Sequence, residues 1–329
     1  MLKRTTIYLG LLVGLGFLYF SFRGVNIDQI RVNIRQLNFG FILAGIAFIV
    51  AEMILRAYRW KFLLRPHSEP KVNQLFSVLM IGYLSNSIIP LRMGELVRAQ
   101  FLGTNYKVNR ARALATIVVE RVFDVLMLSA LFALCLVLYD VFPNSVKRGG
   151  FLAAMGFACL LPLLYFYGTW RNEIVARLHK VTSQTRLGEK ITGIVDNFGL
   201  GLTALNEFRN VLGVVCLSLL IWLTMVSSIS MVLMAFPFKV SFLAGAFVTV
   251  MLGLGMLLPA PPGNIGVYEG FAILALIPFG IEREAALSFS LVLHFLELAI
   301  TMSIGFICFV REAGSVRTGA IKLWPTQGK

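Results

Sequence analysis

The sequence consists largely of apolar blocks, each about as long as a membrane-spanning helix. Helices of roughly 18 to 25 apolar residues can cross the hydrocarbon core of a bilayer, and shorter amphipathic stripes cannot. We therefore expect an all-α, polytopic membrane protein. The pattern predicts about six full transmembrane helices, at residues 5–22, 39–55, 113–139, 150–168, 211–236 and 285–309.

Composition supports a membrane protein over a nucleic-acid-binding one. Hydrophobic residues make up 58% of the chain and charged residues only 14%, whereas a soluble domain carries about a quarter. The net charge of +14 could suit nucleic acid, but the basic residues gather in short stretches beside the apolar blocks. No basic recognition helix or RNA-binding pattern accompanies them. We expect the positive charge to orient the chain and to attract anionic lipid headgroups.

The first apolar block and the cysteines both have simple interpretations. The first block is too long for the core of a signal peptide, and no small-residue cleavage site follows it, so we interpret it as a retained helix. The four cysteines lie inside apolar blocks, with no pair at metal-ligand spacing. We expect buried small side chains there, and neither a metal site nor a cofactor.

Two stretches interrupt the apolar pattern. "SNSIIPLRMGELVR" at 85–98 and "LLPAPPGNIGVYEG" at 257–270 place proline, glycine and glutamate where a continuous membrane helix would exclude them. The segment after the first break is short, so a helix there would cross only about half a bilayer. We predict two re-entrant helical hairpins, the first at about 74–105 and the second at about 242–280. Irregular backbone persists at membrane depth only where protein buries it or where it lines a wet cavity, so we expect a cavity between them.

The distribution of lysine and arginine predicts the orientation of the chain. With re-entrant hairpins and a cytoplasmic N-terminus, the cytoplasmic stretches hold 20 basic residues and the external stretches seven. Both termini are then cytoplasmic, the first hairpin enters from the cytoplasm and the second enters from outside. We expect an amphipathic cytoplasmic connection at about 169–209 and a short basic tail at 311–329.

The chain also contains a weak internal repeat. A shift of 173 residues superimposes Arg121 on His294 and Asp124 on Glu297. The order of events matches in both copies: hairpin, Pro/Gly turn, acidic residue, then a long helix with polar residues at i and i+3. We predict a single membrane domain at 1–310 with repeat units at about 74–139 and 242–309. The units are inverted, which in membrane transporters marks a substrate site at the repeat interface.

Charged residues within the apolar blocks are the candidate site. Charge at membrane depth costs several kcal/mol unless it is paired or wet, so these residues either clamp helices together or bind and couple substrate. The block at 113–139 holds Glu120, Arg121 and Asp124; Glu120 and Asp124 share a helix face, and Arg121 can pair with Asp124. A basic cuff before the first hairpin either anchors the helix end or attracts headgroups, and comprises Arg56, Arg59 and Lys61.

Each hairpin adds its own candidates. Arg92 stands at the first break, and Glu95 and Arg98 share a face of the half-helix that follows. A half-helix N-terminus beside an arginine can clamp phosphate, although a simple cap near the interface fits equally. In the second hairpin, a headgroup site or a purely structural turn would use Asn264, Tyr268 and Glu269. His294 and Glu297 should face this hairpin, where a His–Glu pair can carry a proton or simply fill the core.

No soluble-enzyme motif is present. The sequence lacks a P-loop, GxSxG and HExxH, so we do not expect an enzyme. Two alternatives remain open beside transport. One is a membrane-embedded transferase that uses a lipid-phosphate donor, and the other is a non-transporting scaffold for envelope-lipid enzymes.

Four stretches, in order, resemble the flippase-like transmembrane family: "RAYRWKFLL", "NSIIPLRMGELVRA", "ERVFDVLML" and "LLPAPPGNIGVYEG". This family includes the membrane half of lysylphosphatidylglycerol synthases and stand-alone bacterial and archaeal relatives, and the similarity covers about 1–310. This chain has "PPGNIG" where many relatives have two glycines after the proline. The residues at the family's motif positions are Arg92, Glu95, Glu120, Arg121, Asp124, Asn264 and Glu269.

The resemblance implies a lipid translocase of the cytoplasmic membrane. It implies movement of an anionic phospholipid, an aminoacyl-phospholipid or a polyprenyl-phosphate-linked lipid between leaflets. Fused relatives carry a cytosolic domain that makes the lipid, and only a short stretch follows 309 here, so the resemblance argues against lysyl transfer. It leaves room for a separately encoded lipid-modifying enzyme or glycosyltransferase as a partner.

Overall fold

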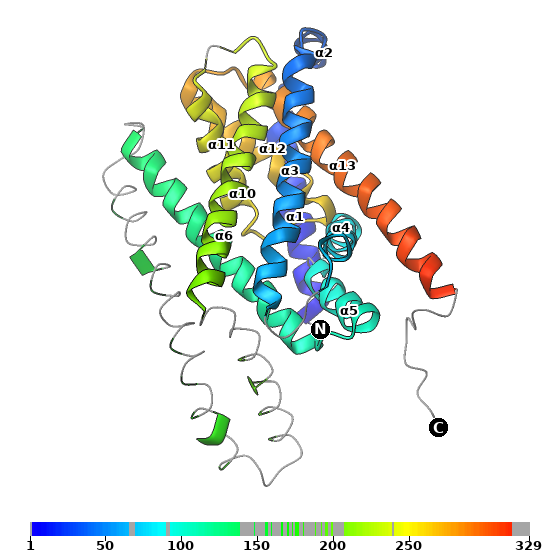
Figure 1. Cartoon of the computed structure of the whole chain (residues 1–329). Coiled ribbons are helices and arrows are strands. Elements are labelled where there is room, and N and C mark those ends of the chain that lie inside the picture. Colours follow the sequence, from blue (N-terminus) through cyan, green and yellow to red (C-terminus); the bar gives the residue numbers. More distant parts are fainter. Residues whose placement is uncertain are drawn as a thin grey trace.

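The computed structural model describes residues 2–65, 70–89, 93–138, 207–238 and 240–317, with isolated positions between 148 and 199. Every regular element in these ranges is helical, which confirms the all-α prediction (Figure 1). In chain order the elements are α1 (Leu2–Phe22), α2 (Ile27–Arg35), α3 (Phe39–Leu64), α4 (Val72–Ile88), α5 (Gly94–Tyr106), α6 (Arg110–Leu138), α10 (Phe208–Met234), α11 (Phe242–Gly255), η3 (Pro262–Asn264), α12 (Val267–Leu276), η4 (Ile277–Phe279) and α13 (Arg283–Arg317).

Five segments of the described chain are long and apolar enough to cross a membrane: Phe39–Leu64, Arg110–Leu138, Arg209–Met234, Pro262–Phe279 and Arg283–Ala313. A sixth is possible if α1 and α2 count as one span bent by 81°. Most of these match the predicted blocks. The predicted span at 150–168, most of the connection at 169–209 and the end of the tail beyond 317 lie outside the described residues.

One predicted helix end is wrong. The apolar pattern ends the block at 39–55 before a basic cuff, but α3 continues to Leu64. One face of its second half is buried in the bundle, where Trp60, Leu63 and Leu64 are at most 1% exposed, while Tyr58 on another face is 46% exposed. The arginines in this half therefore belong to the helical bundle, where carboxylates neutralise them.

Both predicted hairpins are present. α4 packs against α5, and α11 packs against α12. Figure 1 shows the first pair near the end of the bundle where the N-terminus lies and the second pair nearer the opposite end. α5 has 13 residues and α12 has ten, so at 1.5 Å per residue the two α-helices span about 20 Å and 15 Å, less than the hydrocarbon core. With η3 and η4, however, the returning arm of the second hairpin runs over Pro262–Phe279 and is long enough to cross a membrane.

The two arms of the first hairpin approach each other closely. A Cβ atom on Gly94 would overlap the carbonyl oxygen of Gly82, so only glycine fits at this crossing. Asn86 Oδ1 then accepts the Gly94 N–H at 2.7 Å and caps the start of α5, which satisfies an otherwise orphaned helix amide.

The tip of the second hairpin, residues 256–266, contains three prolines and three residues with positive φ angles. Gly263, Asn264 and Gly266 have φ angles of 69°, 57° and 89°. Glycine and asparagine tolerate these angles best. α1 covers the tip, because a Cβ on Gly266 would overlap the Gly14 carbonyl. The backbone conformation of the turn is thus set by its sequence, and α1 packs closely on it.

Each hairpin has its own hydrophobic core. One cluster joins α10 to α13 and includes Ile229, Phe247, Ile273 and Phe289. A second cluster joins α3 to α6 and includes Trp60, Leu75, Leu102 and Phe123. The halves are also packed against each other, because α3 contacts α10 and α13 contacts α4, and a third apolar cluster, which includes Met53, Met80 and Cys308, joins α3, α4 and α13.

Candidate functional site

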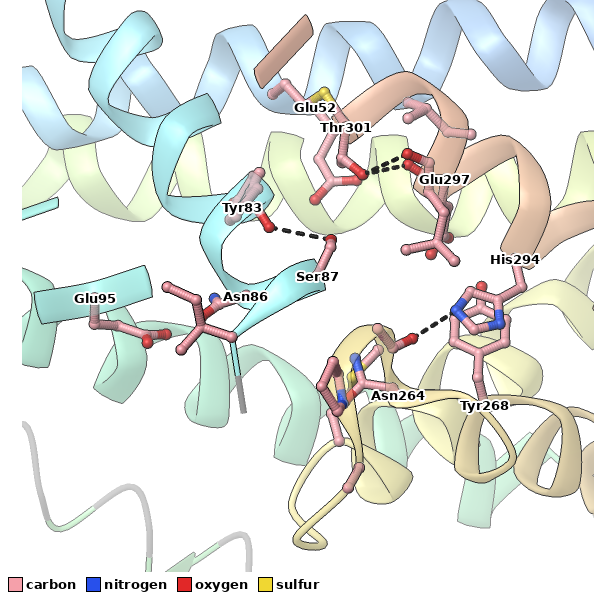
Figure 2. A pocket seen from close by; sticks show the side chains of 18 of the residues that line it. Glu52, Tyr83, Asn86, Ser87, Glu95, Asn264, Tyr268, His294, Glu297 and Thr301 are labelled. Carbon is pink, nitrogen blue, oxygen red and sulfur yellow. Dashed lines mark hydrogen bonds between the residues drawn. The ribbon is translucent and has the colours of Figure 1, made fainter. Parts of the chain in front are cut away.

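A cavity of about 330 Å³ lies where the two hairpins meet. Figure 2 shows Asn86 and Glu95 of the first hairpin on one side and Asn264 and Tyr268 of the second on the other. The lining comprises Ile49, Glu52, Met53, Arg56, Tyr83, Asn86, Ser87, Ile89, Glu95, Arg121, Met225, Met256, Ala260, Pro261, Pro262, Gly263, Asn264, Tyr268, His294, Glu297, Leu298 and Thr301. Ile89 and Glu95, on either side of the first break, and Pro261 to Asn264 of the second therefore line one cavity of mixed polar and apolar character, as expected from irregular backbone at membrane depth.

Hydroxyl groups on the wall donate to their own helices. Ser87 Oγ donates to the Tyr83 carbonyl at 3.1 Å, and Thr301 Oγ1 donates to the Glu297 carbonyl at 2.6 Å (Figure 2). Their lone pairs remain available to accept from a ligand. The carboxylates on the wall are Glu52, Glu95 and Glu297.

Among the described basic residues that line the cavity, Arg121 has the most accessible side chain. Its side chain is 46% exposed, and its nearest carboxylate oxygen, Asp124 Oδ2, lies 3.6 Å away. The predicted Arg121–Asp124 pair therefore exists but is loose. The guanidinium can turn toward an anion in the cavity without abandoning a tight partner.

Asp124 binds more closely to two arginines of α3. Arg59 Nη1 donates to Asp124 Oδ1 at 2.8 Å, and Arg56 Nη1 donates to Asp124 Oδ2 at 3.3 Å. Arg56 also donates to Glu52 at 2.7 Å, and Arg59 to Ser218 Oγ at 3.1 Å. This network ties α3 to α6 and α10 beneath the cavity.

The basic cuff therefore differs from its prediction. Arg59 is 1% exposed, so it cannot attract headgroups at a surface, because Asp124 holds it in the interior. Arg56 lines the cavity but is engaged by Glu52 and Asp124. Lys61 does not line the cavity.

Arg98 and Glu120 form a separate buried pair. Arg98 Nη1 lies 2.9 Å from Glu120 Oε2, and each side chain is 2% exposed. The guanidinium also lies 4.1 Å from the centre of the Trp60 ring, a cation–π geometry. Arg98 and Glu120 thus join α5 to α6, and neither lines the cavity. Of the two residues predicted to share a face of α5, Glu95 lines the cavity and Arg98 does not.

The second hairpin is joined to α13 by a histidine. His294 Nδ1 lies 2.6 Å from Glu269 Oε1, and Nε2 lies 2.8 Å from the Gly263 carbonyl oxygen. Glu269 Oε2 accepts the Gly266 N–H at 2.6 Å. The acid that faces His294 directly is Glu269, while Glu297 occupies the wall beside it.

The structure thus brings Glu95, Arg121, Asn264, Tyr268, His294 and Glu297 to one cavity. Arg92 lies outside the described residues. Sequence reasoning missed Glu52, Tyr83, Asn86, Ser87 and Thr301. The available signal was a polar run at the end of α4, immediately before the break, and a single acid within the apolar block of α3. In the described part of the chain, no group of three or more His, Cys, Asp or Glu side chains is arranged to hold a metal.

Residues 7–305 match the family described as "Lysylphosphatidylglycerol synthase TM region". The match covers most of the chain, so the protein belongs to this family of multi-pass membrane proteins.

Three relatives are archaeal. The glycosyltransferase AglD of Haloferax volcanii is 25% identical over 333 residues, and the match covers 91% of this chain and 53% of AglD. The chain therefore spans about half the length of that relative. Two UPF0104 membrane proteins of Methanothermobacter thermautotrophicus are 24% and 21% identical, with 84% of this chain matched to 85% and 87% of theirs.

Proposed function

We propose that this member of the lysylphosphatidylglycerol synthase transmembrane family moves a lipid with a phosphate-bearing headgroup between the leaflets of a cytoplasmic membrane. The observation that carries the proposal is the polar cavity between two hairpins placed toward opposite ends of the bundle. Alternating access requires a cavity that can be reached from each end in turn, and a hairpin toward each end is consistent with that requirement. The substrate classes are an anionic phospholipid, an aminoacyl-phospholipid or a polyprenyl-phosphate-linked lipid.

The size of the cavity suits a headgroup. Its volume of about 330 Å³ lies at the lower end of ligand pockets, which run from about 300 to 1,000 Å³. Lipid tails do not fit such a space beside a headgroup. The headgroup would cross through the cavity while the tails remain in the bilayer.

The charges support an anion that carries further polar groups. Glu95 in the first turn of α5 and Tyr268 in the first turn of α12 both line the cavity, so two positive helix ends lie beside it. Arg121 adds a fork-shaped donor for phosphate. Glu52 and Glu297 can accept hydrogen bonds from hydroxyl or ammonium groups on the same headgroup.

Leaflet exchange in liposomes tests the proposal. Fluorescent phosphatidylglycerol, aminoacyl-phosphatidylglycerol and polyprenyl phosphate are each reconstituted with the purified protein and bleached from outside by dithionite. We expect protein-dependent bleaching beyond the outer-leaflet half for one lipid, and its loss in Arg121→Ala. Arg31→Ala is the matched control, because Arg31 is 64% exposed on α2 and pairs only with Asp28 at 3.3 Å among the described residues. Equal exchange by the wild type and Arg121→Ala would remove Arg121 from the mechanism.

A transferase that uses a lipid-phosphate donor is the second candidate, because AglD is named a glycosyltransferase. The carboxylates of the cavity would then serve as general bases. Formation of a glycosylated product from a labelled polyprenyl-phosphate sugar, by the purified protein alone, favours this function.

The other alternative is a scaffold that moves no lipid and binds a separately encoded lipid-modifying enzyme or glycosyltransferase. A scaffold predicts that a combined Arg121→Ala and Glu52→Gln variant supports the activity of this partner enzyme as well as the wild type does.

A further inference from the structure

His294 of α13 contacts the tip of the second hairpin through both of its ring nitrogens. Nδ1 lies 2.6 Å from Glu269 Oε1, and Nε2 lies 2.8 Å from the Gly263 carbonyl oxygen. Gly263 lies within the turn and Glu269 in the first turn of α12, so one side chain connects the turn and the returning arm to α13. Figure 2 shows His294 beside Tyr268 and Asn264 of this hairpin. We call Gly263, Glu269 and His294 the tip latch.

The hydrogen bonds of the tip latch determine how many protons it holds. A carbonyl oxygen only accepts, so Nε2 must carry a proton. If Nδ1 carried none, its lone pair would face a carboxylate lone pair at 2.6 Å, which is repulsive. A second proton therefore lies between Nδ1 and Oε1. The proton can reside on histidine, giving imidazolium beside carboxylate, or on glutamate, giving imidazole beside carboxylic acid. In either case the His294–Glu269 pair holds one proton more than a neutral histidine beside an ionised glutamate.

Burial makes this extra proton consequential. The side chains of His294 and Glu269 are 7% and 5% exposed, so loss of the proton would leave a buried net negative charge with a broken hydrogen bond. The Tyr268 ring stacks on His294 with centroids 4.2 Å apart and planes at 12°. An aromatic face beside the imidazole favours the cationic ring.

The charged surroundings come from several elements. α1 contacts the second hairpin through Gly14 and Phe17, and α11 carries no titratable side chain. The titratable groups of the shared cavity that face the latch are Tyr268 of α12, Glu297 of α13, Glu52 and Arg56 of α3, Tyr83 of α4, Glu95 of α5 and Arg121 of α6. Glu52 is neutralised by Arg56 at 2.7 Å. Glu297 is the other acidic side chain on α13 that lines the cavity beside the latch, and when ionised it disfavours the deprotonated latch.

The first hairpin is joined to its long helix in a different way. Its corresponding contact is the Arg98–Glu120 pair, at 2.9 Å. A guanidinium does not lose its proton in proteins. The first hairpin is therefore joined to α6 at any pH where Glu120 is ionised, whereas the second is joined to α13 by a group that can release a proton.

We propose that the tip latch is a proton-binding site that closes the second hairpin against α13, and that loss of its proton releases the tip and opens the cavity at that end. One proton is released for each opening. The proton site does not depend on the proposed function. Its consequence for transport does rest on that function: if the protein moves lipid, release of this proton is coupled to lipid movement.

Spin-label distance measurements test the site without any transport assay. In a chain whose four native cysteines are replaced by alanine, labels are placed at Ile265→Cys on the tip and Leu43→Cys on α3, which are 46% and 67% exposed. The purified protein is measured in lipid nanodiscs between pH 5 and pH 9. We expect a second, longer-distance population that grows as the pH rises.

Two variants separate protonation from simple support of the fold. Glu269→Gln keeps an oxygen that can accept the Gly266 N–H, so the cap of α12 survives, and His294→Gln keeps a donor of similar length. We expect distance distributions in both variants that do not change with pH. A label pair on the first hairpin and α6, Ile88→Cys and Leu134→Cys, which are 57% and 49% exposed, should likewise stay constant.

Two results overturn the proposal: a wild-type tip distribution that is constant from pH 5 to pH 9, or Gln variants that keep the wild-type pH response. The outcomes for the two proposals are distinguishable. A pH-responsive tip in a protein that moves no lipid leaves the proton site standing and removes translocation. Lipid exchange with a pH-independent tip removes the proton site alone.

Discussion

Arg98 of α5 and Glu120 of α6 form an ion pair at 2.9 Å in which each side chain is 2% exposed. Glu120 precedes the cavity-lining Arg121 in the sequence, yet the two side chains point to different environments. The pair fixes the returning arm of the first hairpin to the long helix that presents Arg121. The Arg98–Glu120 pair is therefore a structural interaction that helps to position Arg121, the candidate substrate-binding residue.

Removal of one partner of this pair should destabilise the protein strongly. Glu120→Ala leaves the Arg98 guanidinium buried without its carboxylate, at a cost of about 3–5 kcal/mol. The double variant Arg98→Met with Glu120→Leu should be more stable than Glu120→Ala, because no buried charge remains. Thermal unfolding in detergent micelles measures both, and a Glu120→Ala protein as stable as the wild type would contradict the buried pairing.

Asp124→Asn should also destabilise the protein, without a change in side-chain size. The uncharged amide cannot neutralise Arg59, which is 1% exposed and lies 2.8 Å from the native carboxylate. We expect a loss of the same order, about 3–5 kcal/mol. Asp28→Asn is the control, since its ion pair with Arg31 has side chains 83% and 64% exposed and should contribute little. Comparable unfolding temperatures for the two variants would show that Asp124 is not an interior counter-ion.

Substitution of Arg121 should separate function from stability. Its side chain is 46% exposed and its ion pair with Asp124 is 3.6 Å long, so Arg121→Ala should change the free energy of unfolding by no more than about 1 kcal/mol. Leaflet exchange should nevertheless be lost. Arg121→Lys keeps the charge without the planar fork and should retain part of the activity. A loss of exchange that merely follows a loss of folded protein would argue against a substrate contact.

Gly94→Ala should disrupt the first hairpin. The added Cβ would overlap the Gly82 carbonyl oxygen, and backbone atoms cannot rotate away, so we expect a cost of about 1–3 kcal/mol. Gly16→Ala on α1 meets nothing within 4 Å and should stabilise its helix by up to about 1 kcal/mol. Unfolding in detergent compares the two, and equal effects would refute the close crossing of α4 and α5.

The all-helical class and both hairpins could be predicted because their causes are local. An apolar block must satisfy its own backbone hydrogen bonds in a bilayer and therefore forms a helix. Proline and glycine disfavour a continuous helix, and they interrupt the apolar pattern at two places, between Pro90 and Gly94 and between Pro259 and Gly266. The end of α3 was misplaced because Arg56 and Arg59 suggest a helix end until their carboxylate partners are known.

The partners of the charged residues depended on the tertiary structure. Spacing of three or four residues shows which side chains share a face of one helix. From this spacing, Arg121 was the expected partner of Asp124, and Glu297 the expected partner of His294. The shorter contacts instead come from other helices: Arg59 for Asp124 at 2.8 Å, and Glu269 for His294 at 2.6 Å. Helical periodicity defines the faces of each helix, but only the packing of the bundle decides which faces meet.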